Sequence, residues 1–467
     1  MSDRPQLLAS QAAEDFRRAA HQAVDWIADY LADPRNYPVL PNLEPGDLID
    51  RLPKSGPEAG EPVERLLEDF HRLIVPATTH WNHPRFMAYF GSSGSGPGVL
   101  GELLSATLNM NAMVWKSGPA SAELEQVALG WLRQWMGLPE DFFGIIYDTA
   151  SISSTHAMAA ARQMADPECR RRGSRGDLTA YISTQTHSSI EKAAIALGIG
   201  QDNVRKLEVD GEFRMQPGEL AAAIQQDLAA GRKPFFVAAT VGTTSTTSID
   251  PVAEMAEIAA RYGLWLHVDA AYAGAAAILP EIRPLFNGVE RAHSLVMNPH
   301  KWLFTPSDCS AFYTRRPDLL REAFSLVPEY LRTQEHPRAV NFMDYGLQLG
   351  RRFRSLKLWF VMRYFGRQGL QQILRNHIQW AQQLAKAIGE DPRFEIVAPT
   401  PLSVVCFRLR ASDQDNQKLV EKVNASGKAF FSGTVLKGRY AIRFSIGNIG
   451  TSWEDVQQAW DLIRAAA

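Results

Sequence analysis

Apolar side chains in the first 32 residues recur at spacings of three and four, which predicts an amphipathic helix over residues 1–32. The residues on its apolar face are Phe16, Ala20, Val24, Ile27 and Leu31. The Pro- and Gly-rich stretch from Asp33 to Pro62 cannot continue a helix, so we expect an extended chain there. A helix followed by an extended arm has little core of its own. We therefore expect residues 1–85 to lie across another surface, such as that of a second subunit.

From residue 86 to 360, apolar runs rich in β-formers alternate with Ala-rich helical runs. The expected strands are Phe143–Tyr147, Thr179–Ser183, Phe235–Thr240, Leu264–Val268, Ser294–Met297 and Ser310–Thr314. The expected helices include Ser154–Met164, Glu191–Leu197, Pro217–Ala230 and Pro251–Tyr262. This alternation predicts an α/β fold with a large, mostly parallel sheet covered by helices on both faces. Such sheets bind ligands at the carboxyl ends of their strands.

Residues 361–467 have a different pattern, which predicts a smaller C-terminal α+β domain. Its expected elements are helices Leu370–Ile388, Gln414–Ser426 and Ser452–Ala466 and strands Arg393–Val397, Leu402–Leu409 and Tyr440–Ser445. The sequence thus divides into an arm (1–85), a large α/β domain (86–360) and a small domain (361–467).

Composition narrows the possible classes of protein. The chain of 467 residues is 45% hydrophobic and 21% charged, as is usual for a soluble globular protein. A formal charge of −2 gives no reason to expect binding to nucleic acid or to an anionic membrane. Cys169, Cys309 and Cys406 are too scattered for a disulfide framework or a zinc site. With no secretory signal and no transmembrane run visible, we expect a cytoplasmic protein without a membrane anchor.

Two charged residues at strand ends suggest cofactor chemistry. Asp269 ends the apolar run that begins at Leu264, and Lys301 lies 32 residues further on, beside His300 and on the following strand. A lysine amine can form a Schiff base with the aldehyde of pyridoxal phosphate, and an aspartate can keep its pyridine nitrogen protonated. Either residue alone is as readily explained as a surface charge or a helix cap. The pair predicts a pyridoxal 5′-phosphate site.

A phosphate site is predicted where the strand Gly144–Tyr147 gives way to an Ala-rich helix. Thr149, Ala150 and Ser151 would present small side chains and free backbone N–H groups at that helix N-terminus. Asn298 could add a side-chain donor. A plain helix N-cap is the alternative interpretation of the same residues.

Three further polar residues are candidates at strand ends. His187 follows the strand Thr179–Ser183 and could stack on a flat cofactor, although a lone histidine is more often a cap or core residue. Thr244, within Thr243–Ser245, could reach the cofactor's ring oxygen. His300 could orient substrate or relay a proton.

These segments, in this order, resemble the group II pyridoxal-phosphate decarboxylases, and most closely the aromatic-L-amino-acid decarboxylases. The most specific pair is His267-Val-Asp-Ala-Ala-Tyr-Ala-Gly274 with Asn298-Pro-His-Lys-Trp302. Other matching segments are Thr79–Trp81, Ala88–Phe90, His187–Ser189, Val241–Thr244, Asp308–Ala311, Pro328–Leu331 and Gly350–Trp359. The resemblance extends from about residue 12 to the C-terminus.

The resemblance implies a fold-type-I pyridoxal-phosphate enzyme and a role for each matching residue. Lys301 becomes the Schiff-base lysine, Asp269 the pyridinium partner, and His187 and Ala271 the residues against the two faces of the ring. Thr149, Ala150, Ser151 and Asn298 fall where the family holds phosphate. Trp81, Tyr89 and Phe90 fall where it lines an aromatic pocket. Tyr330 matches the tyrosine of a mobile catalytic loop that reaches the partner's site, which implies a homodimer with shared active sites.

This chain also departs from the family pattern. Asp148 precedes Thr149 where relatives usually have Gly or Ser, and Met113 stands where animal enzymes often have Phe. The segment Asp344–Gly350 is about three residues shorter than in relatives.

The expected reaction is decarboxylation of an aromatic L-amino acid to its amine, with Tyr330 returning the proton to Cα, assisted by His187 or His300. The alternatives are an aromatic aldehyde synthase, a decarboxylase of an acidic amino acid such as glutamate, and a catalytically idle dimeric scaffold. Gly350 matches a position where, in plant relatives, Gly accompanies indolic substrates and Ser phenolic ones. With the adaptable wall of Met113, this favours tryptophan or a substituted tryptophan. The alternative is that Gly350 serves only the turn before the next helix.

Overall fold

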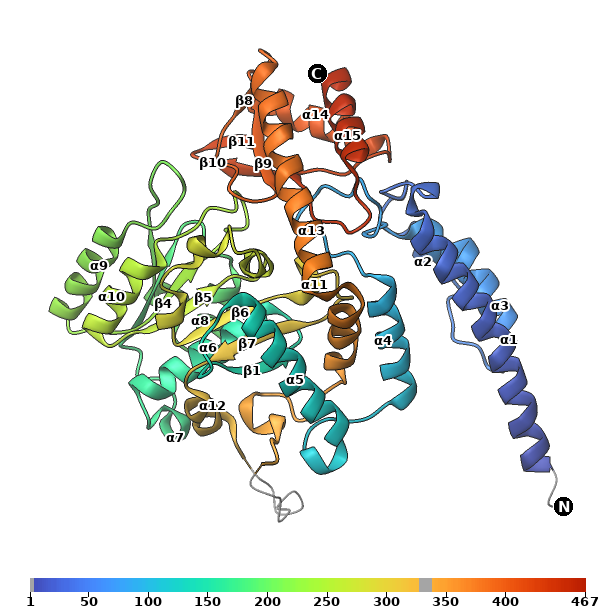
Figure 1. Ribbon diagram of the computed structural model, residues 1–467, viewed down its shortest axis with the longest axis horizontal. Helices are drawn as coiled ribbons and strands as arrows, with labels where there is room; N and C mark the ends of the chain where they lie inside the picture. Colours follow the sequence, from blue (N-terminus) through green and yellow to red (C-terminus); the bar gives the residue numbers. More distant parts are fainter. Residues whose placement is uncertain (1–3, 327–337) are drawn as a thin grey trace.

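The computed structural model describes residues 4–326 and 338–467. The N-terminal arm lies to one side of the body in Figure 1. It comprises α1 (Arg4–Ala32), α2 (Asp47–Arg51) and α3 (Val63–Asp69). The amphipathic helix expected over residues 1–32 is confirmed by α1. The stretch from Asp33 to Pro62 is not wholly extended, because α2 interrupts it after Gly46, which adopts a left-handed φ of 108°.

The large domain is built on a seven-stranded sheet in the order β1-β7-β6-β5-β4-β2-β3. The strands are β1 (Phe143–Tyr147), β2 (Leu178–Ser183), β3 (Val204–Leu207), β4 (Lys233–Thr240), β5 (Trp265–Asp269), β6 (Ser294–Met297) and β7 (Ser310–Thr314). Strands β3, β2, β4, β5 and β6 are mutually parallel, and β7 pairs antiparallel with both β6 and β1. The expectation of a mostly parallel sheet is therefore confirmed. The carboxyl ends of β1, β2, β4, β5 and β6 meet at one edge.

Helices cover both faces of this sheet (Figure 1). The helices of this domain are α4 (Gly96–Leu108), α5 (Pro119–Met136), α6 (Ala150–Ala165), α7 (Cys169–Arg172), α8 (Ser189–Ala196), α9 (Pro217–Ala229), α10 (Val252–Tyr262), α11 (Pro299–Trp302) and α12 (Pro317–Phe324). Alternate strand residues belong to two separate cores. Leu266 and Val268 pack with α5, α9 and α10, whereas Trp265 packs with α6 and α8. Burial on both faces explains why these strands read as continuous apolar runs.

The small domain has a four-stranded antiparallel sheet in the order β10-β11-β9-β8. Its elements are β8 (Phe394–Ile396), β9 (Val404–Leu409), β10 (Ser432–Leu436), β11 (Arg439–Ser445), α14 (Asp413–Ala425) and α15 (Trp453–Ala466). The long helix α13 (Arg354–Glu390) joins the two domains and bends at Gly366, whose φ of 61° is not helical. The helix thus continues past residue 360, where the sequence suggests a domain boundary.

The segment Phe86–Phe90 lies against the small domain, although its position in the chain groups it with the large one. Met87 N donates to Phe430 O at 2.9 Å, and Ser445 N donates to Met87 O at 2.9 Å. This strand-like contact brings the aromatic residues at 89 and 90 to the junction between the two domains.

Candidate active site

Asp269 and Lys301 lie on neighbouring strands, at the edge where the carboxyl ends meet. Asp269 is the last residue of β5 and pairs with Val296 of β6. Lys301 does not lie on a strand, as the sequence had suggested, but in the helical turn α11, because Pro299 at its first position favours a turn over a ladder. Asn298 N donates to Ala271 O at 2.9 Å and ties the two strand ends together.

Asp269 is prepared to bind a cation or a protonated ring nitrogen. The side chain is buried, and its Oδ1 accepts a hydrogen bond from Ala271 N at 3.0 Å. That bond fixes the carboxylate and leaves Oδ2 for a second partner. Ala271 is itself buried beside it, consistent with a small residue under a flat ring.

Lys301 has the electrostatic environment of a nucleophilic amine. Burial lowers its pKa, the charge of Asp269 opposes that shift, and the charge of Arg443 reinforces it. Its Nζ lies 5.2 Å from the centre of the Phe90 ring. The lowered pKa favours the neutral amine that Schiff-base chemistry requires.

His187 lies just beyond β2 and within electrostatic reach of both Asp269 and Lys301. Its Nδ1 accepts a hydrogen bond from Ser189 N at 3.2 Å and lies 2.8 Å from Ser189 Oγ, so the ring proton belongs on Nε2. Burial lowers its pKa, although part of the ring stays exposed. An oriented, neutral imidazole with a free face suits stacking on a cofactor.

His300 is more constrained. Its Nδ1 accepts a hydrogen bond from Cys309 N at 2.9 Å, and burial lowers its pKa to about 4. At neutral pH the ring is therefore uncharged and carries its proton on Nε2. In that state it can orient a group by donating a hydrogen bond more readily than it can deliver a proton.

The N-terminus of α6 has the features of a phosphate site. Thr149 is its N-cap residue but makes no side-chain capping bond, and both Thr149 and Ser151 are exposed. The helix crosses the sheet, since Ser153 Oγ lies 2.9 Å from Ser310 Oγ and Ser154 Oγ lies 3.3 Å from His267 Nε2. Free N–H groups at this end can bind an anion.

Two further observations bear on the fit of phosphate. Asn298 is buried, yet its Oδ1 has no hydrogen-bond partner among the described residues, so this oxygen can accept from a water molecule or a ligand hydroxyl, while a phosphate oxygen would need the Nδ2 donor. Asp148 brings a negative charge next to the site, and Arg354, which also pairs with Asp308 at 2.7 Å, offsets it in part. Arg354 Nη2 lies 2.7 Å from Asp148 Oδ1, and Gln348 Nε2 donates to Asp148 Oδ2 at 2.7 Å. The residues present therefore fit pyridoxal phosphate.

Thr244 stays exposed at the carboxyl end of β4, free to contact a bound ring. Its neighbour Thr243 is buried, and Thr243 Oγ1 lies 2.9 Å from Thr246 Oγ1. The turn is thus held by Thr243.

The structure separates the three predicted aromatic pocket residues into two groups. Phe90 is buried, stacks on Tyr272 at 4.0 Å between ring centres, and faces Lys301. Trp81 and Tyr89 are half exposed and stack on one another at 5.9 Å. Phe90 thus lies beside Lys301, whereas Trp81 and Tyr89 have no described contact with that lysine.

Met113 and Gly350 lie near one another but have no described contact with Lys301 in the same chain. Asn111 links them, because its side chain accepts from Arg351 N and approaches Met113 Sδ. Tyr330 lies outside the described residues.

Arg443 is a site residue that sequence reasoning missed. It is buried on β11 and its guanidinium centre lies 5.2 Å from the Phe90 ring centre. Nε donates to Ser245 O at 3.0 Å and Nη1 to Tyr89 O at 3.0 Å, but Nη2 has no partner in the described part of the chain. A single arginine in the apolar strand Tyr440–Ser445 was the available signal.

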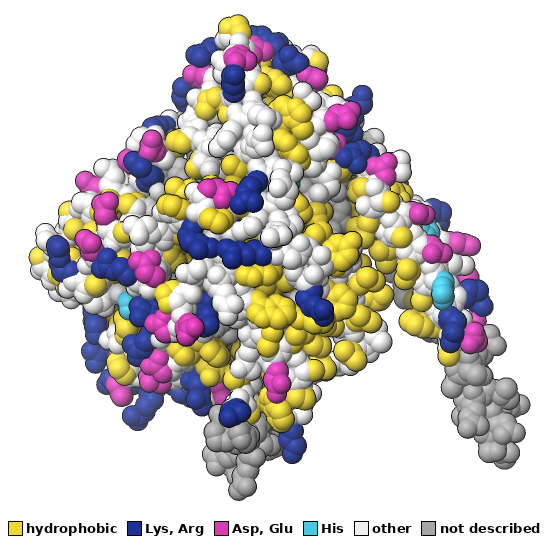
Figure 2. All heavy atoms as spheres, in the orientation of Figure 1, with side chains coloured by type: hydrophobic (Ala, Val, Ile, Leu, Met, Phe, Trp, Pro, Cys, Tyr) yellow, Lys and Arg dark blue, Asp and Glu magenta, His cyan; other side chains and the backbone are white. Residues whose placement is uncertain are grey.

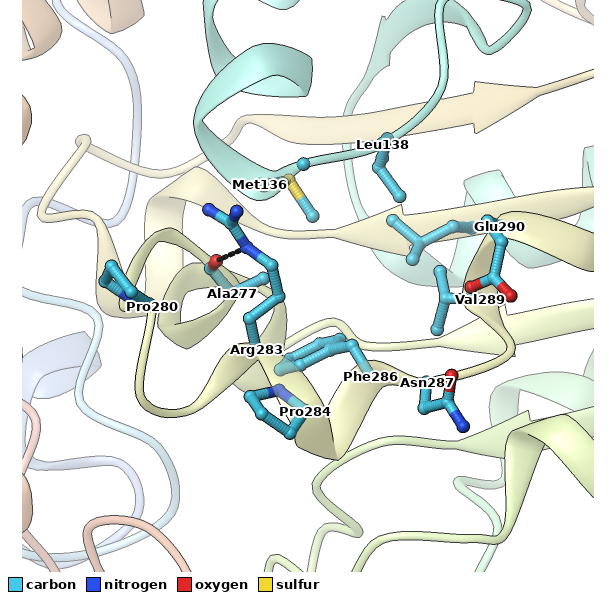
Figure 3. Close-up of a pocket in the computed structure, with 12 residues that line it drawn as sticks. Met136, Leu138, Ala277, Pro280, Arg283, Pro284, Phe286, Asn287, Val289 and Glu290 are labelled. Carbon is cyan, nitrogen blue, oxygen red and sulfur yellow. Dashed lines mark hydrogen bonds between the residues drawn. The ribbon is translucent and has the colours of Figure 1, made fainter.

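Figure 3 shows a separate hollow on the large domain, lined by Met136, Leu138, Phe286 and Val289. Its arginine, Arg283, donates to Trp135 O at 3.0 Å and so caps the end of α5. None of the candidate catalytic residues lines this hollow. Within residues 4–326 and 338–467, no cluster of His, Cys, Asp or Glu could hold a metal ion. No helix of those residues is long and apolar enough to cross a membrane.

The conserved domain of pyridoxal-dependent decarboxylases matches residues 45–410. The chain is 42% identical to tyrosine decarboxylase 2 of Narcissus pseudonarcissus, over 97% of this chain and 94% of that protein. It is 42% identical to tryptophan decarboxylase TDC2 of Camptotheca acuminata (97% and 95% covered) and 39% identical to phenylacetaldehyde synthase of Rosa hybrid cultivar (98% and 95%).

Solved structures are also similar over most of the chain. The Oryza sativa TDC bound to PLP and tryptamine has a TM-score of 0.93 at 38% identity, covering 97% of this chain and 98% of that one. The Catharanthus roseus tryptophan decarboxylase bound to L-tryptophan has a TM-score of 0.91 at 38% identity, with the same coverage.

Proposed function

Because this chain belongs to the pyridoxal-dependent decarboxylases, which use pyridoxal 5′-phosphate, we propose that it converts an aromatic L-amino acid to the corresponding amine and CO2. The observation that carries the proposal is the position of Phe90, whose buried ring lies beside the Lys301 amine. An aromatic wall at the reacting end of the site favours an aromatic side chain in the substrate.

Each residue of the site has a task in this reaction. When bound, pyridoxal phosphate would supply the electron-withdrawing ring that decarboxylation requires. Asp269 would keep the pyridine nitrogen protonated, and His187 and Ala271 would lie against the two faces of the ring. Arg443, whose Nη2 has no partner among the described residues, can hold the substrate's α-carboxylate. Tyr330 returns a proton to Cα, and His300 orients the groups around it.

An aromatic aldehyde synthase is the second candidate, and the similarity to phenylacetaldehyde synthase favours it. There Cα reacts with O2, so that aldehyde, ammonia and hydrogen peroxide replace the amine. A tyrosine at 330 supplies the proton that prevents this outcome. Decarboxylation of an acidic amino acid is less well supported. Of the two described cations beside Phe90, Lys301 would hold the cofactor and Arg443 would bind the α-carboxylate, which leaves neither for a second carboxylate.

The role of Tyr330 can be tested through the products. Tyr330→Phe removes the proton donor, so we expect it to release CO2 while forming aldehyde and peroxide in place of amine. The measurement is the ratio of peroxide to CO2 for each form of the enzyme. Amine as the main product of the phenylalanine variant would assign the proton to another group.

Among aromatic substrates we propose tryptophan or a substituted tryptophan. A Cβ placed on Gly350 would meet Asn111 Nδ2 at 3.7 Å as its nearest described heavy atom outside the neighbouring residues, so the glycine leaves a space that a side chain at this position would fill. Gly350→Ser should reduce kcat/KM for tryptophan relative to tyrosine by about tenfold, since one pocket residue usually contributes about 1–3 kcal/mol of discrimination. Tyrosine and phenylalanine are the comparison substrates, and an unchanged ratio would remove Gly350 from the specificity argument.

We also propose that the protein is a cytoplasmic homodimer with shared active sites. Helix α4 exposes Leu100, Leu103, Leu104 and Leu108, each at least 46% accessible. Figure 2 shows apolar side chains gathered on the body beside the arm. An apolar surface of this kind is typical of a subunit interface. Mixing Lys301→Ala with Tyr330→Phe chains should restore amine formation, because a hybrid dimer would contain one site with both native residues.

A further inference from the structure

The side chain of Asn111 lies beside the open space at Gly350. Apart from the residues next to Gly350 in the chain, the described heavy atoms within 4 Å of a Cβ placed there are Asn111 Nδ2 at 3.7 Å and Asn111 Oδ1 at 3.9 Å. Both distances are ordinary van der Waals contacts. Whatever fills the space beside Gly350 therefore meets the amide of Asn111.

Hydrogen bonds fix the orientation of this amide. Asn111 Oδ1 accepts from Arg351 N at 3.0 Å, so the oxygen is already used. Among the described residues, Asn111 Nδ2 has only the weak acceptor Met113 Sδ, at 3.8 Å. The backbone is held as well, because Ala112 N donates to Arg351 O at 2.9 Å. The amide thus presents N–H donors from an exposed, fixed position.

Asn111 lies at the edge of the apolar surface of α4. It follows the helix by three residues, and Leu108, the last residue of the helix, is 57% accessible. In the dimer proposed above this surface is covered, and Asn111 then faces the neighbouring subunit together with Met113 and Gly350. The amide would be enclosed with the substrate rather than left in water.

We infer that Asn111 is a specificity-determining residue that donates a hydrogen bond to an oxygen substituent on the distal ring of the substrate. This inference rests on the proposed function and refines its substrate class to hydroxy- or alkoxy-substituted tryptophans. A substrate without the oxygen leaves an enclosed N–H unpaired, which typically lowers kcat/KM by about tenfold.

The test compares substituents of similar size that differ in hydrogen bonding. Methoxy and ethyl groups at the 5- or 6-position of tryptophan both extend the ring, but only methoxy accepts a hydrogen bond. For the wild-type holoenzyme we expect kcat/KM for the methoxy compound to exceed that for the ethyl compound by about tenfold at one of the two positions. No methoxy preference at either position would overturn the inference.

Asn111→Asp separates the two roles of the side chain. The carboxylate still accepts from Arg351 N, so the loop keeps its anchor, but it cannot donate to a methoxy oxygen. We expect the methoxy-to-ethyl ratio to fall to about one or below, while tryptophan is still decarboxylated. Thr107→Val, which removes an exposed hydroxyl on α4 that donates to Leu103 O, is the matched control and should leave the ratio unchanged.

A failure of the role of Asn111 and a failure of the proposed function would give different results. Normal tryptophan turnover with an unchanged methoxy-to-ethyl ratio in Asn111→Asp would show that Asn111 only anchors the loop. Absence of CO2 release from every aromatic amino acid tested would contradict the proposed function itself.

Discussion

Two basic side chains, Lys301 and Arg443, lie beside the Phe90 ring at the reacting end of the site. Lys301 Nζ and the Arg443 guanidinium each lie 5.2 Å from the centre of Phe90. Burial and the neighbouring charge lower the pKa of Lys301, and Asp269 limits that shift. The arrangement keeps the amine neutral enough to react while the carboxylate remains available to the ring nitrogen.

Replacing Asp269 or Lys301 should have different consequences. Asp269→Asn should retain the cofactor but lose turnover by more than about 100-fold, because a neutral pyridine accepts electrons poorly. Lys301→Ala should keep the fold while losing the visible absorbance of the covalently bound cofactor. Single-turnover kinetics and absorbance spectra of the two variants provide the measurement. Substantial turnover by Asp269→Asn would contradict the assignment.

Sequence alone identified Asp269 and Lys301 because both follow apolar strand-like runs, and topology brings such ends together. Arg443 was not identifiable in this way. Two features identify Arg443 as a site residue: it is buried, and its Nη2 has no partner among the described residues. Both depend on how the small domain packs against Phe90. The separation of Phe90 from Trp81 and Tyr89 likewise depends on packing that no periodicity records.

At the scale of elements, the N-terminus of α6 has backbone N–H groups without a side-chain cap, and the charge of the nearby Asp148 is partly offset. Thr149 leaves the first N–H groups uncapped, and Arg354 offsets the acid at Asp148. We therefore expect anion binding here to depend on the helix end as much as on any side chain.

Ser151→Glu tests this role of the helix end. A glutamate in the first turn of a helix is neutral or stabilising for folding, but it would repel a phosphate. We expect the affinity for pyridoxal phosphate to fall by about tenfold or more, without loss of thermal stability. Thr155→Glu, one turn further along α6, is the control and should bind the cofactor more tightly than Ser151→Glu. Equal affinities would place the phosphate elsewhere.

Most strands were predictable because burial on both faces gives continuous apolar runs. The edge strands β3 and β10 were missed. In β3 the sequence Val204-Arg-Lys-Leu207 has charged residues in its centre, and in β10 Gly433 interrupts the pattern. Edge strands face solvent on one side and tolerate such residues. The turn at Lys301 was also missed, since a single helical turn has no periodicity to detect.

At the scale of the whole molecule, buried neutral histidines make stability depend on pH. Burial lowers the pKa of His267 and His300 to about 4, and that of His156 and His377 to about 3. An unfolded histidine titrates near 6.5, so below that pH the unfolded chain takes up protons that the folded chain does not. Stability is therefore complete above about pH 6.5 and lost as the pH falls towards 4.

The expected slope is roughly 1.4 kcal/mol per pH unit for each such histidine. Urea denaturation at pH 7 and pH 5 measures it. His377→Gln should reduce this slope, because glutamine does not take up a proton in the unfolded chain. The fold should be kept, since glutamine can still accept the hydrogen bond that Trp302 Nε1 donates to His377 Nδ1 at 3.0 Å. A denaturation midpoint that does not change between the two pH values would contradict this account.

The central claim is decarboxylation of an aromatic amino acid, and the most direct test is the stoichiometry of its products. Purified protein saturated with pyridoxal 5′-phosphate is supplied with L-tryptophan, and CO2, tryptamine and hydrogen peroxide are measured together, with L-glutamate in a parallel reaction. We predict one CO2 and one tryptamine for each tryptophan consumed, no peroxide, and no CO2 from glutamate. Peroxide equal to CO2, or CO2 from glutamate in preference to aromatic substrates, would contradict the account.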